Sequence, residues 1–233
     1  MGNFIVLDTE ALTDSRDKNL GAHALVYDIG FIVANRNGDV LDKYSLVNTD
    51  VFMKPEKMAT AYYHDKLPQY HESIGELWEP MDWQHIVELF RSVVMEYKIK
   101  DVWAYNVKFD QAACNFTTSE LSNRWRKFFA PYGTKWRDIW DYAGSTICNT
   151  RKYVKFCQSN GLVSPSGNPS TSADTVGKYL RGTLDYQEQH TALSDCEDEL
   201  AILLAAFRRK QKARHSKGQG WRDAAEIAKQ MNQ

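Results

Sequence analysis

A turn sequence between two apolar runs narrows the possible folds more than any other part of this chain. Residues 35–39 read Asn-Arg-Asn-Gly-Asp, and they separate a β-rich run at residues 24–34 from an alternating run at residues 40–47. An Asn-Gly pair accepts the positive φ angles that a tight hairpin requires. Residues 3–9 form another short β-rich run. The sequence therefore predicts that the chain opens as a three-stranded antiparallel meander.

After residue 82 the apolar residues recur at the spacing of an α-helix, and strand-like and helical segments then alternate. Residues 83–97 have this helical period, with Asp82 placed as the N-cap. Further strands are predicted at residues 101–105 and 135–141, and further helices at residues 110–116, 119–129 (capped by Ser119), 149–159 and 194–213. Residues 161–172, rich in Gly, Pro and Ser, are predicted to be a loop. This order predicts an α/β fold, with a mixed sheet of an antiparallel three-strand meander plus parallel strands, flanked by helices.

The chain has 233 residues, enough for one substantial core, and we expect one domain over residues 1–207. The formal net charge of −1 gives no overall attraction to phosphate. Residues 208–217 nevertheless contain six Lys or Arg and no acid. We expect residues 208–233 to be a basic extension with a short helix. Its charge is consistent either with a solvated helix end or with contact to nucleic acid.

The cysteines and the apolar runs indicate the compartment. The four cysteines show no Cys-x-x-Cys spacing, which argues against a structural zinc site and against a dense disulfide framework. Reduced thiols are typical of the cytosol. The longest apolar run, residues 200–207, is far too short for a membrane span. We therefore expect a cytoplasmic protein without a membrane partner, and a bacterial or phage-infected cell fits its compact layout.

Asp8 and Glu10 are the first candidates for chemistry. Residues two apart in a strand point to the same face, so both carboxylates would project together from the first β-rich run. Two adjacent carboxylates repel each other unless a cation lies between them. The alternative is that the strand ends at Leu7 and both acids lie in a solvated loop.

Two later segments supply further candidates. Asp110, in the sequence Tyr-Asn-Val-Lys-Phe-Asp, stands at the start of a predicted helix, where an anion is favoured. Residues 190–200 place His190 five residues before Asp195. Five helical residues correspond to a rotation that puts the two side chains on different faces. Ser194 and Glu197 form a possible capping box, which would leave His190 in the preceding loop, free to fold over the site. Alone, each segment also fits an ordinary solvated acid or histidine.

Taken in order, the three segments resemble the motifs of the DEDDh exonuclease superfamily, which includes polymerase proofreading subunits, RNase T and oligoribonuclease. Val-Leu-Asp-Thr-Glu (residues 6–10) is similar to its first motif, Asn-Val-Lys-Phe-Asp (106–110) to its second, and His-Thr-Ala-Leu-Ser-Asp (190–195) to its third. A histidine rather than a tyrosine in the third motif is typical of this subgroup. The motifs span most of the chain.

The resemblance implies a ribonuclease H-like fold and a two-metal 3′→5′ exonuclease. Asp8 would bridge two divalent cations, Glu10 and Asp195 would complete the first site, and Asp110 would hold the second. His190 would accept a proton from the attacking water. Carboxylate ligands suit Mg²⁺ or Mn²⁺, and two such ions about 3.5–4 Å apart can activate water and offset charge on the phosphate. The partner would be nucleic acid with a free 3′ end, and the products nucleoside 5′-monophosphates.

Four residues beside the motifs are candidate substrate contacts: Thr9, Leu12, Asn106 and Phe109. For Leu12 and Phe109, packing in the core is an equally good interpretation. Discrimination between DNA and RNA depends on contacts to the 2′-hydroxyl, which the sequence does not show. Single-stranded DNA is the slightly preferred expectation over RNA. An exoribonuclease or oligoribonuclease, or a catalytically idle nucleic-acid-binding module on the same fold, remains an alternative. The oligomeric state is not indicated.

Overall fold

A computed structural model of the chain describes residues 2–13, 23–59, 61, 64–122, 127–209 and 220–231. The chain divides into two compact units, and each is described by itself. Unit 1 comprises Met1–Arg137 and His190–Cys196, and unit 2 comprises Asp138–Gln189 and Glu197–Gln233. The predicted boundary between residues 207 and 208 stays a prediction. Among the described residues, no helix has both the length and the apolar character needed to cross a bilayer.

Unit 1 opens with the predicted antiparallel meander. Its strands are β1 (Phe4–Leu12), β2 (Leu25–Ala34) and β3 (Val40–Asn48). In the connecting turn, the Gly38 N–H donates to the Asn35 carbonyl at 3.1 Å. Only the glycine of the Asn-Gly pair takes a positive φ, at +97°. The hairpin turn predicted at residues 35–39 is therefore confirmed, and within the Asn-Gly pair the positive φ falls on the glycine.

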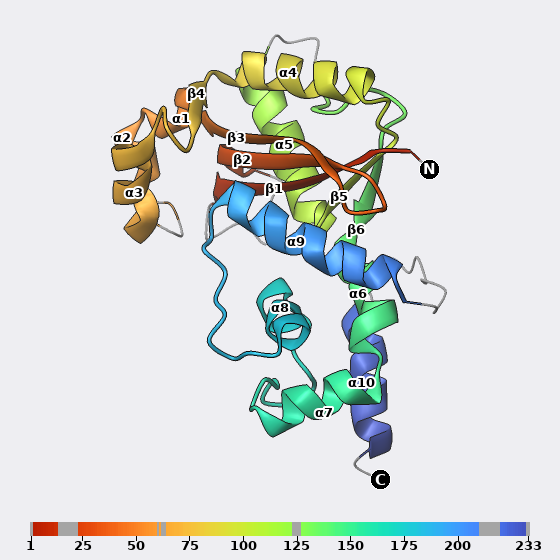
Figure 1. The fold of residues 1–233 in the computed structure, drawn as a ribbon. Coiled ribbons are helices and arrows are strands. Elements are labelled where there is room, and N and C mark those ends of the chain that lie inside the picture. The colour runs from red at the N-terminus through yellow and green to blue at the C-terminus, as the bar shows by residue number, and fades with distance from the viewer. Residues whose placement is uncertain are drawn as a thin grey trace. The chain divides into compact units, whose positions relative to one another are not determined.

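Three short strands complete a mixed six-stranded sheet (Figure 1). They are β4 (Glu79–Met81), β5 (Asp101–Ala104) and β6 (Lys135–Asp138), and the strand order is β4-β3-β2-β1-β5-β6. β5 runs parallel to β1, and β4 runs parallel to β3. The predicted α/β class, with an antiparallel meander extended by parallel strands and flanked by helices, is confirmed.

Helices α4 (Trp83–Glu96) and α5 (Val107–Leu121) supply the apolar residues that pack against the sheet. Asp82 caps α4 as predicted, because its Oδ1 accepts the His85 N–H at 3.1 Å. The predicted second helix after Ser119 is wrong, because Ser119 lies inside α5. Phe128 is 65 % exposed, and Trp125 lies outside the described residues.

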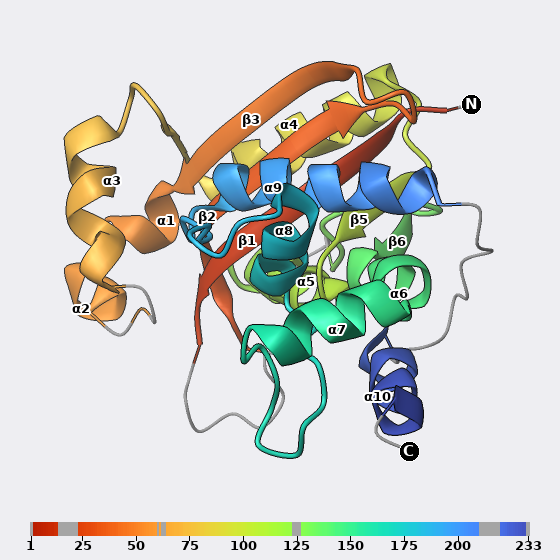
Figure 2. The same ribbon diagram turned by 60° about the horizontal axis from the view of Figure 1, so that its bottom comes forward.

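The segment between β3 and β4 contains short helices that the sequence did not predict. They are α1 (Thr49–Phe52), α2 (Pro55–Met58), the 3₁₀ turn η1 (His64–Lys66) and α3 (Leu67–Ser73). Figures 1 and 2 show α1, α2 and α3 grouped beside one end of the sheet. Tyr70 of α3 is fully buried in a second apolar cluster there.

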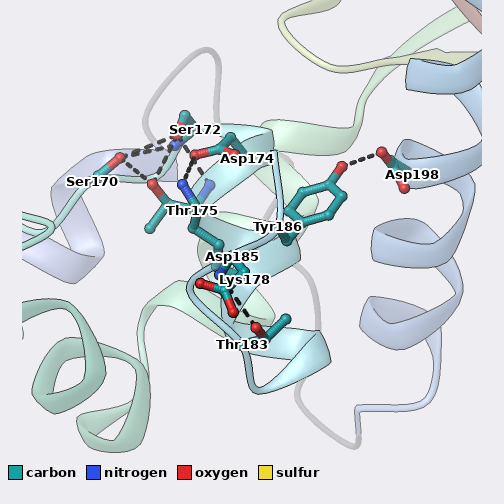
Figure 3. A network of polar contacts seen from close by, with 9 residues as sticks. All are labelled: Ser170, Ser172, Asp174, Thr175, Lys178, Thr183, Asp185, Tyr186 and Asp198. Carbon is teal, nitrogen blue, oxygen red and sulfur yellow. Dashed lines mark hydrogen bonds and ion pairs between the residues drawn. The ribbon is translucent and has the colours of Figure 1, made fainter. Parts of the chain in front are cut away.

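Unit 2 consists of helices. They are α6 (Ile139–Ala143), the π-helical turn η2 (Gly144–Cys148), α7 (Arg151–Ser159), α8 (Ala173–Arg181), α10 (Gly220–Met231) and the larger part of α9 (Ala192–Phe207). The sequence predicted α7 within two residues but missed α8. Figure 3 shows the polar network around α8, in which Tyr186 donates to Asp198 and Lys178 pairs with Asp174.

α9 begins earlier than predicted. It starts at Ala192, so Ser194 lies inside its first turn and the capping box with Glu197 is wrong. His190 still precedes the helix, as expected. The helix ends at Phe207, and most of the basic run lies outside the described residues. All four cysteines are free and buried, in agreement with the expected reduced thiols.

Candidate active site

Strand β1 presents Asp8 and Glu10 on one face and Thr9 on the other. The strand continues to Leu12, so the alternative that the acids lie in a loop after Leu7 is wrong. Asp8 lies opposite Gly30 of β2, and Glu10 lies opposite Asp28. Because side chains alternate along a strand, both carboxylates project from the face that also carries Asp28.

Glu10 meets two residues that lie about 180 positions further along the chain. The ligand atoms of Glu10, His190 and Asp195 all lie within 4.8 Å of one another, and we call these residues the carboxylate–histidine trio. His190 Nδ1 is 4.0 Å from Asp195 Oδ2. Asp195 is 9 % exposed, whereas the His190 side chain is 35 % exposed and accessible to water.

Asp110 reaches β1 from α5. The Thr9 hydroxyl donates a hydrogen bond of 2.8 Å to Asp110 Oδ1, and both residues are buried. Burial, followed by the charges of Asp110 and Asp8, raises the pKa of the Cys114 thiol well above its ordinary value. The negative charges of Asp8 and Asp110 thus both influence the pKa of the same thiol, although neither residue belongs to the trio.

The position of the end of β5 brings Asp8 and Asp110 to the same edge of the sheet. β5 pairs with β1 only at Ile5 and Val6, so Asp8 lies beyond the carboxyl end of its parallel neighbour. Asn106, with φ +60°, then turns the chain into α5, and Asp110 falls in the first turn of that helix. Crevices beyond the carboxyl ends of parallel strands are common ligand sites in α/β proteins.

The four candidate substrate contacts lie in different environments. Leu12 is 8 % exposed and packs in the apolar cluster around Tyr70, and Phe109 is half-buried against the main core. Thr9 is buried and donates its hydroxyl to Asp110, while Asn106 is exposed. A role in substrate binding stays a prediction for each of them.

Sequence reasoning missed Asp28, which is fully buried. Its Oδ2 accepts hydrogen bonds from the Tyr70 hydroxyl at 2.5 Å and from the Ala192 N–H at 2.9 Å. Burial raises the pKa of the Asp28 carboxyl to about 6, against the lowering effect of these two bonds. Burial and the nearby Asp28 also raise the pKa of Tyr70. The signal that could have identified Asp28 was the presence of an acid inside the apolar run of residues 24–34.

The donors at this site fit a hard divalent cation. Carboxylate oxygens are the ligands that Mg²⁺ and Mn²⁺ prefer, and in the trio two carboxylates lie within 4.8 Å of each other, with the His190 imidazole equally near. A cation there would also offset the repulsion between the acids of β1 and α9.

Comparisons with known proteins identify the fold. No family model matches the chain, and no curated protein matches its sequence. Among solved structures, Escherichia coli Exonuclease I in complex with a dT13 oligonucleotide is similar, with a TM-score of 0.54, 14% identity, and coverage of 90% of this chain and 42% of that chain. A moderately thermophilic Exonuclease I from Methylocaldum szegediense gives a TM-score of 0.50 at 13% identity, with coverage of 89% of this chain and 41% of that chain.

These similarities concern the fold. The chain spans less than half the length of either exonuclease, and at such low identity the shared architecture is what the match shows. The mixed sheet and its flanking helices therefore match those of a nuclease fold.

Proposed function

We propose that this chain is a metal-dependent 3′→5′ exonuclease that releases nucleoside 5′-monophosphates, with single-stranded DNA as the favoured substrate. The observation that carries the proposal is the convergence of Glu10, His190 and Asp195 within 4.8 Å. Acids and a histidine that converge from distant segments of a chain are the kinds of group that form metal and catalytic sites. The order of the three sequence motifs and the nuclease-like fold support the same conclusion.

Four carboxylates would hold two divalent cations, Mg²⁺ or Mn²⁺. Glu10 and Asp195 would form one site, Asp110 the other, and Asp8 would be shared between them. When bound, such cations lower the pKa of water and offset the negative charge that develops on the phosphate oxygens.

His190 would act as the general base. An imidazole with an ordinary pKa of about 6.5 accepts a proton efficiently near neutral pH. Its partial exposure lets a water molecule reach the ring, and Asp195 Oδ2, 4.0 Å from Nδ1, would stabilise the protonated form. His190 would therefore take a proton from the attacking water and leave the ring positively charged beside a carboxylate.

Digestion of an end-labelled oligonucleotide tests the proposal. With a 5′-fluorophore on single-stranded DNA and Mn²⁺ present, a 3′→5′ exonuclease produces a ladder of labelled, progressively shorter strands. A 5′→3′ enzyme would instead release the label at once. We expect the ladder, and we expect chelation with EDTA to abolish it.

Variants locate the activity in the site. His190→Ala should reduce digestion by at least about 100-fold, because general-base catalysis alone contributes that much. Asp8→Ala should reduce digestion at least as much, because it removes a carboxylate that would hold the cations. Glu120→Gln, an exposed acid on the same helix as Asp110, is the matched control and should leave the rate unchanged. Full activity in folded Asp8→Ala or His190→Ala would refute the proposal.

The same assay separates the rival functions. An idle binding module would retain oligonucleotides without shortening them. Matched RNA and DNA strands, single and double, would distinguish an exoribonuclease from a DNA exonuclease by their relative rates.

A further inference from the structure

The residue beside the site that most needs an explanation is Asp28 of β2. A carboxylate that is fully buried normally requires a full set of partners, because it has lost its hydration. Both described hydrogen bonds of Asp28 go to a single oxygen, Oδ2. Within the described part of the chain, the other oxygen, Oδ1, is buried without a hydrogen-bond partner. Asp28 therefore acts through one acceptor atom.

Asp28 Oδ2 accepts hydrogen bonds from two segments that are distant from each other in sequence. Tyr70, on α3, donates its hydroxyl, and Ala192, the first residue of α9, donates its backbone N–H. The first N–H groups of a helix have no partner within the helix, so a carboxylate placed here fixes the start of α9.

Two further contacts bring the same turn of α9 against β2. A Cβ atom added to Gly30 would lie only 2.4 Å from the backbone nitrogen of Leu193, so the two backbones approach as closely as a glycine allows. The Cys196 thiol donates to the Gly30 carbonyl at 3.2 Å. The first turn of α9 is thus held at its beginning and at its end.

This turn carries Asp195, and the segment that leads into it carries His190, so both belong to the carboxylate–histidine trio beside this anchor. His190 lies two residues before Ala192, and Asp195 lies three residues after it. His190 also has a φ of +55°, a left-handed conformation that a residue with a side chain adopts only where its surroundings hold it. The bond from Ala192 to Asp28 anchors the chain to β2 two residues after this position.

We propose that Asp28 is a positioning residue for the exonuclease reaction, which sets His190 and Asp195 against Glu10 by holding the first turn of α9, while Tyr70 orients its carboxylate. The inference rests on the proposed function. It assigns to α3 a part in the site, because Tyr70 reaches Asp28 from that helix. Gly30, two residues further along the same face, leaves the space that the Leu193 backbone needs at this contact.

Two replacements of Asp28 test the inference, because one removes the acceptor atom and the other keeps an acceptor oxygen but removes the charge. Asp28→Ala removes the acceptor, and we expect kcat to fall about 10- to 100-fold with little change in KM, since a misplacement of about 1 Å can cost that much. Asp28→Asn keeps an oxygen at the Oδ2 position, so we expect it to restore kcat to within about threefold of the wild-type value. A purely structural role would lower the amount of folded enzyme without changing kcat per folded molecule.

Two other variants break the same connection by different means. Tyr70→Phe removes one of the two bonds, and we expect a loss of kcat smaller than that of Asp28→Ala. Gly30→Ala forces the Leu193 backbone away from β2, and we expect a loss comparable to Asp28→Ala. The matched control is Tyr153→Phe, which removes a buried hydroxyl that donates to the Ser170 carbonyl at 2.7 Å within unit 2. It should lower stability and leave kcat unchanged.

Amide hydrogen exchange provides a readout besides activity. In the wild type and in Asp28→Asn the Ala192 amide should exchange slowly, and in folded Asp28→Ala it should exchange much faster. Unchanged kcat and unchanged Ala192 exchange in folded Asp28→Ala would overturn the inference, as would an Asp28→Asn variant as impaired as Asp28→Ala. If the wild type digested no oligonucleotide, the proposed function would fail. Ala192 exchange and the Mn²⁺ affinity of the Asp28 variants would then decide whether Asp28 shapes the trio.

Discussion

At the scale of single residues, Thr9 connects the two faces of β1. Its neighbours Asp8 and Glu10 project from one face, while its own hydroxyl turns to the other and donates to Asp110 at 2.8 Å. A buried hydrogen bond to a carboxylate contributes about 1.5–3 kcal/mol. Thr9 therefore limits the orientations available to Asp110, and this role differs from the substrate contact that the sequence suggested.

Thr9→Val tests this role, because valine keeps the shape of threonine and removes the hydroxyl. We expect the Mn²⁺ concentration for half-maximal activity to rise about tenfold, which corresponds to about 1.4 kcal/mol of weaker restraint on Asp110. Steady-state digestion at several Mn²⁺ concentrations measures it. Thr9→Ser should restore the wild-type value, whereas an increase in KM for the oligonucleotide alone would favour substrate contact instead.

The sequence motifs singled out candidate catalytic residues, and their roles stay predictions, but no motif pointed to the buried residues that contact the same segments. Asp8, Asp110 and Asp195 follow recognisable motifs, so they could be singled out without coordinates. Asp28 and Tyr70 belong to no motif, and they meet only because the chain brings residues 42 positions apart together. A supporting residue is defined by its contacts, and contacts between distant segments are what one sequence does not contain.

At the scale of elements, the start of α4 combines a helix cap with an ion pair. Asp82 accepts the His85 backbone N–H through Oδ1 and faces the His85 ring nitrogen Nδ1 through Oδ2 at 2.5 Å. Burial is the largest single influence on Asp82 and raises its pKa, but the hydrogen bonds and charge of His85, with the bond from the Gln84 N–H, together lower that pKa. The hydrogen bond and the charge of Asp82 raise the pKa of His85.

These shifts predict how the cap depends on pH. The stabilisation from His85 is complete below its ordinary pKa of 6.5 and disappears as the pH rises through its raised value in the folded protein. The stabilisation from Asp82 is complete above 3.8 and disappears as the pH falls through its lowered value. Melting curves of His85→Gln should therefore show a lower Tm than the wild type at pH 5.5 and an equal Tm at pH 9. An equal deficit at both pH values would contradict the ion pair.

Long elements were predicted better than short ones. The strands of the meander and α4 each have five or more apolar positions, and their predicted limits agree with the structure to within three residues. Helices α1 and α2 have four residues each, which is about one turn, too short for any period to appear. The start of α9 was misplaced because the carboxylate of Asp28, not Ser194, receives the N–H of its first residue.

At the scale of the whole molecule, the acidic site and the basic run lie in separate parts of the sequence. α10 follows the basic run, and its Ala224, Ala225 and Ala228 are buried within unit 2. Trp221, at the start of the same helix, is 41% exposed, and the guanidinium carbon of Arg222 lies 5.4 Å from the centre of its ring. Truncation after Phe207 would remove this helix together with the basic run, so it would confuse charge with packing.

Neutralising the basic run is the cleaner test of its interaction with nucleic acid. We expect replacement of Lys210, Lys212, Arg214 and Lys217 by Gln to weaken binding of single-stranded DNA. The slope of log K against log salt should become shallower by about 0.7 for each phosphate that the protein no longer neutralises. Binding measured between low and high salt gives this slope. An unchanged slope would leave the run without a role in binding.

The central claim is that Asp8, Glu10, Asp110 and Asp195 form one site for divalent cations, and a Mn²⁺ titration tests it most directly. Calorimetry on the wild type should detect two bound Mn²⁺ ions, and bound metal should raise Tm, because a ligand at 100 times its Kd stabilises a fold by about 2.7 kcal/mol. Asp8→Asn and Glu10→Gln should each lose at least one of these ions while remaining folded. Undiminished Mn²⁺ binding in both variants would contradict the account.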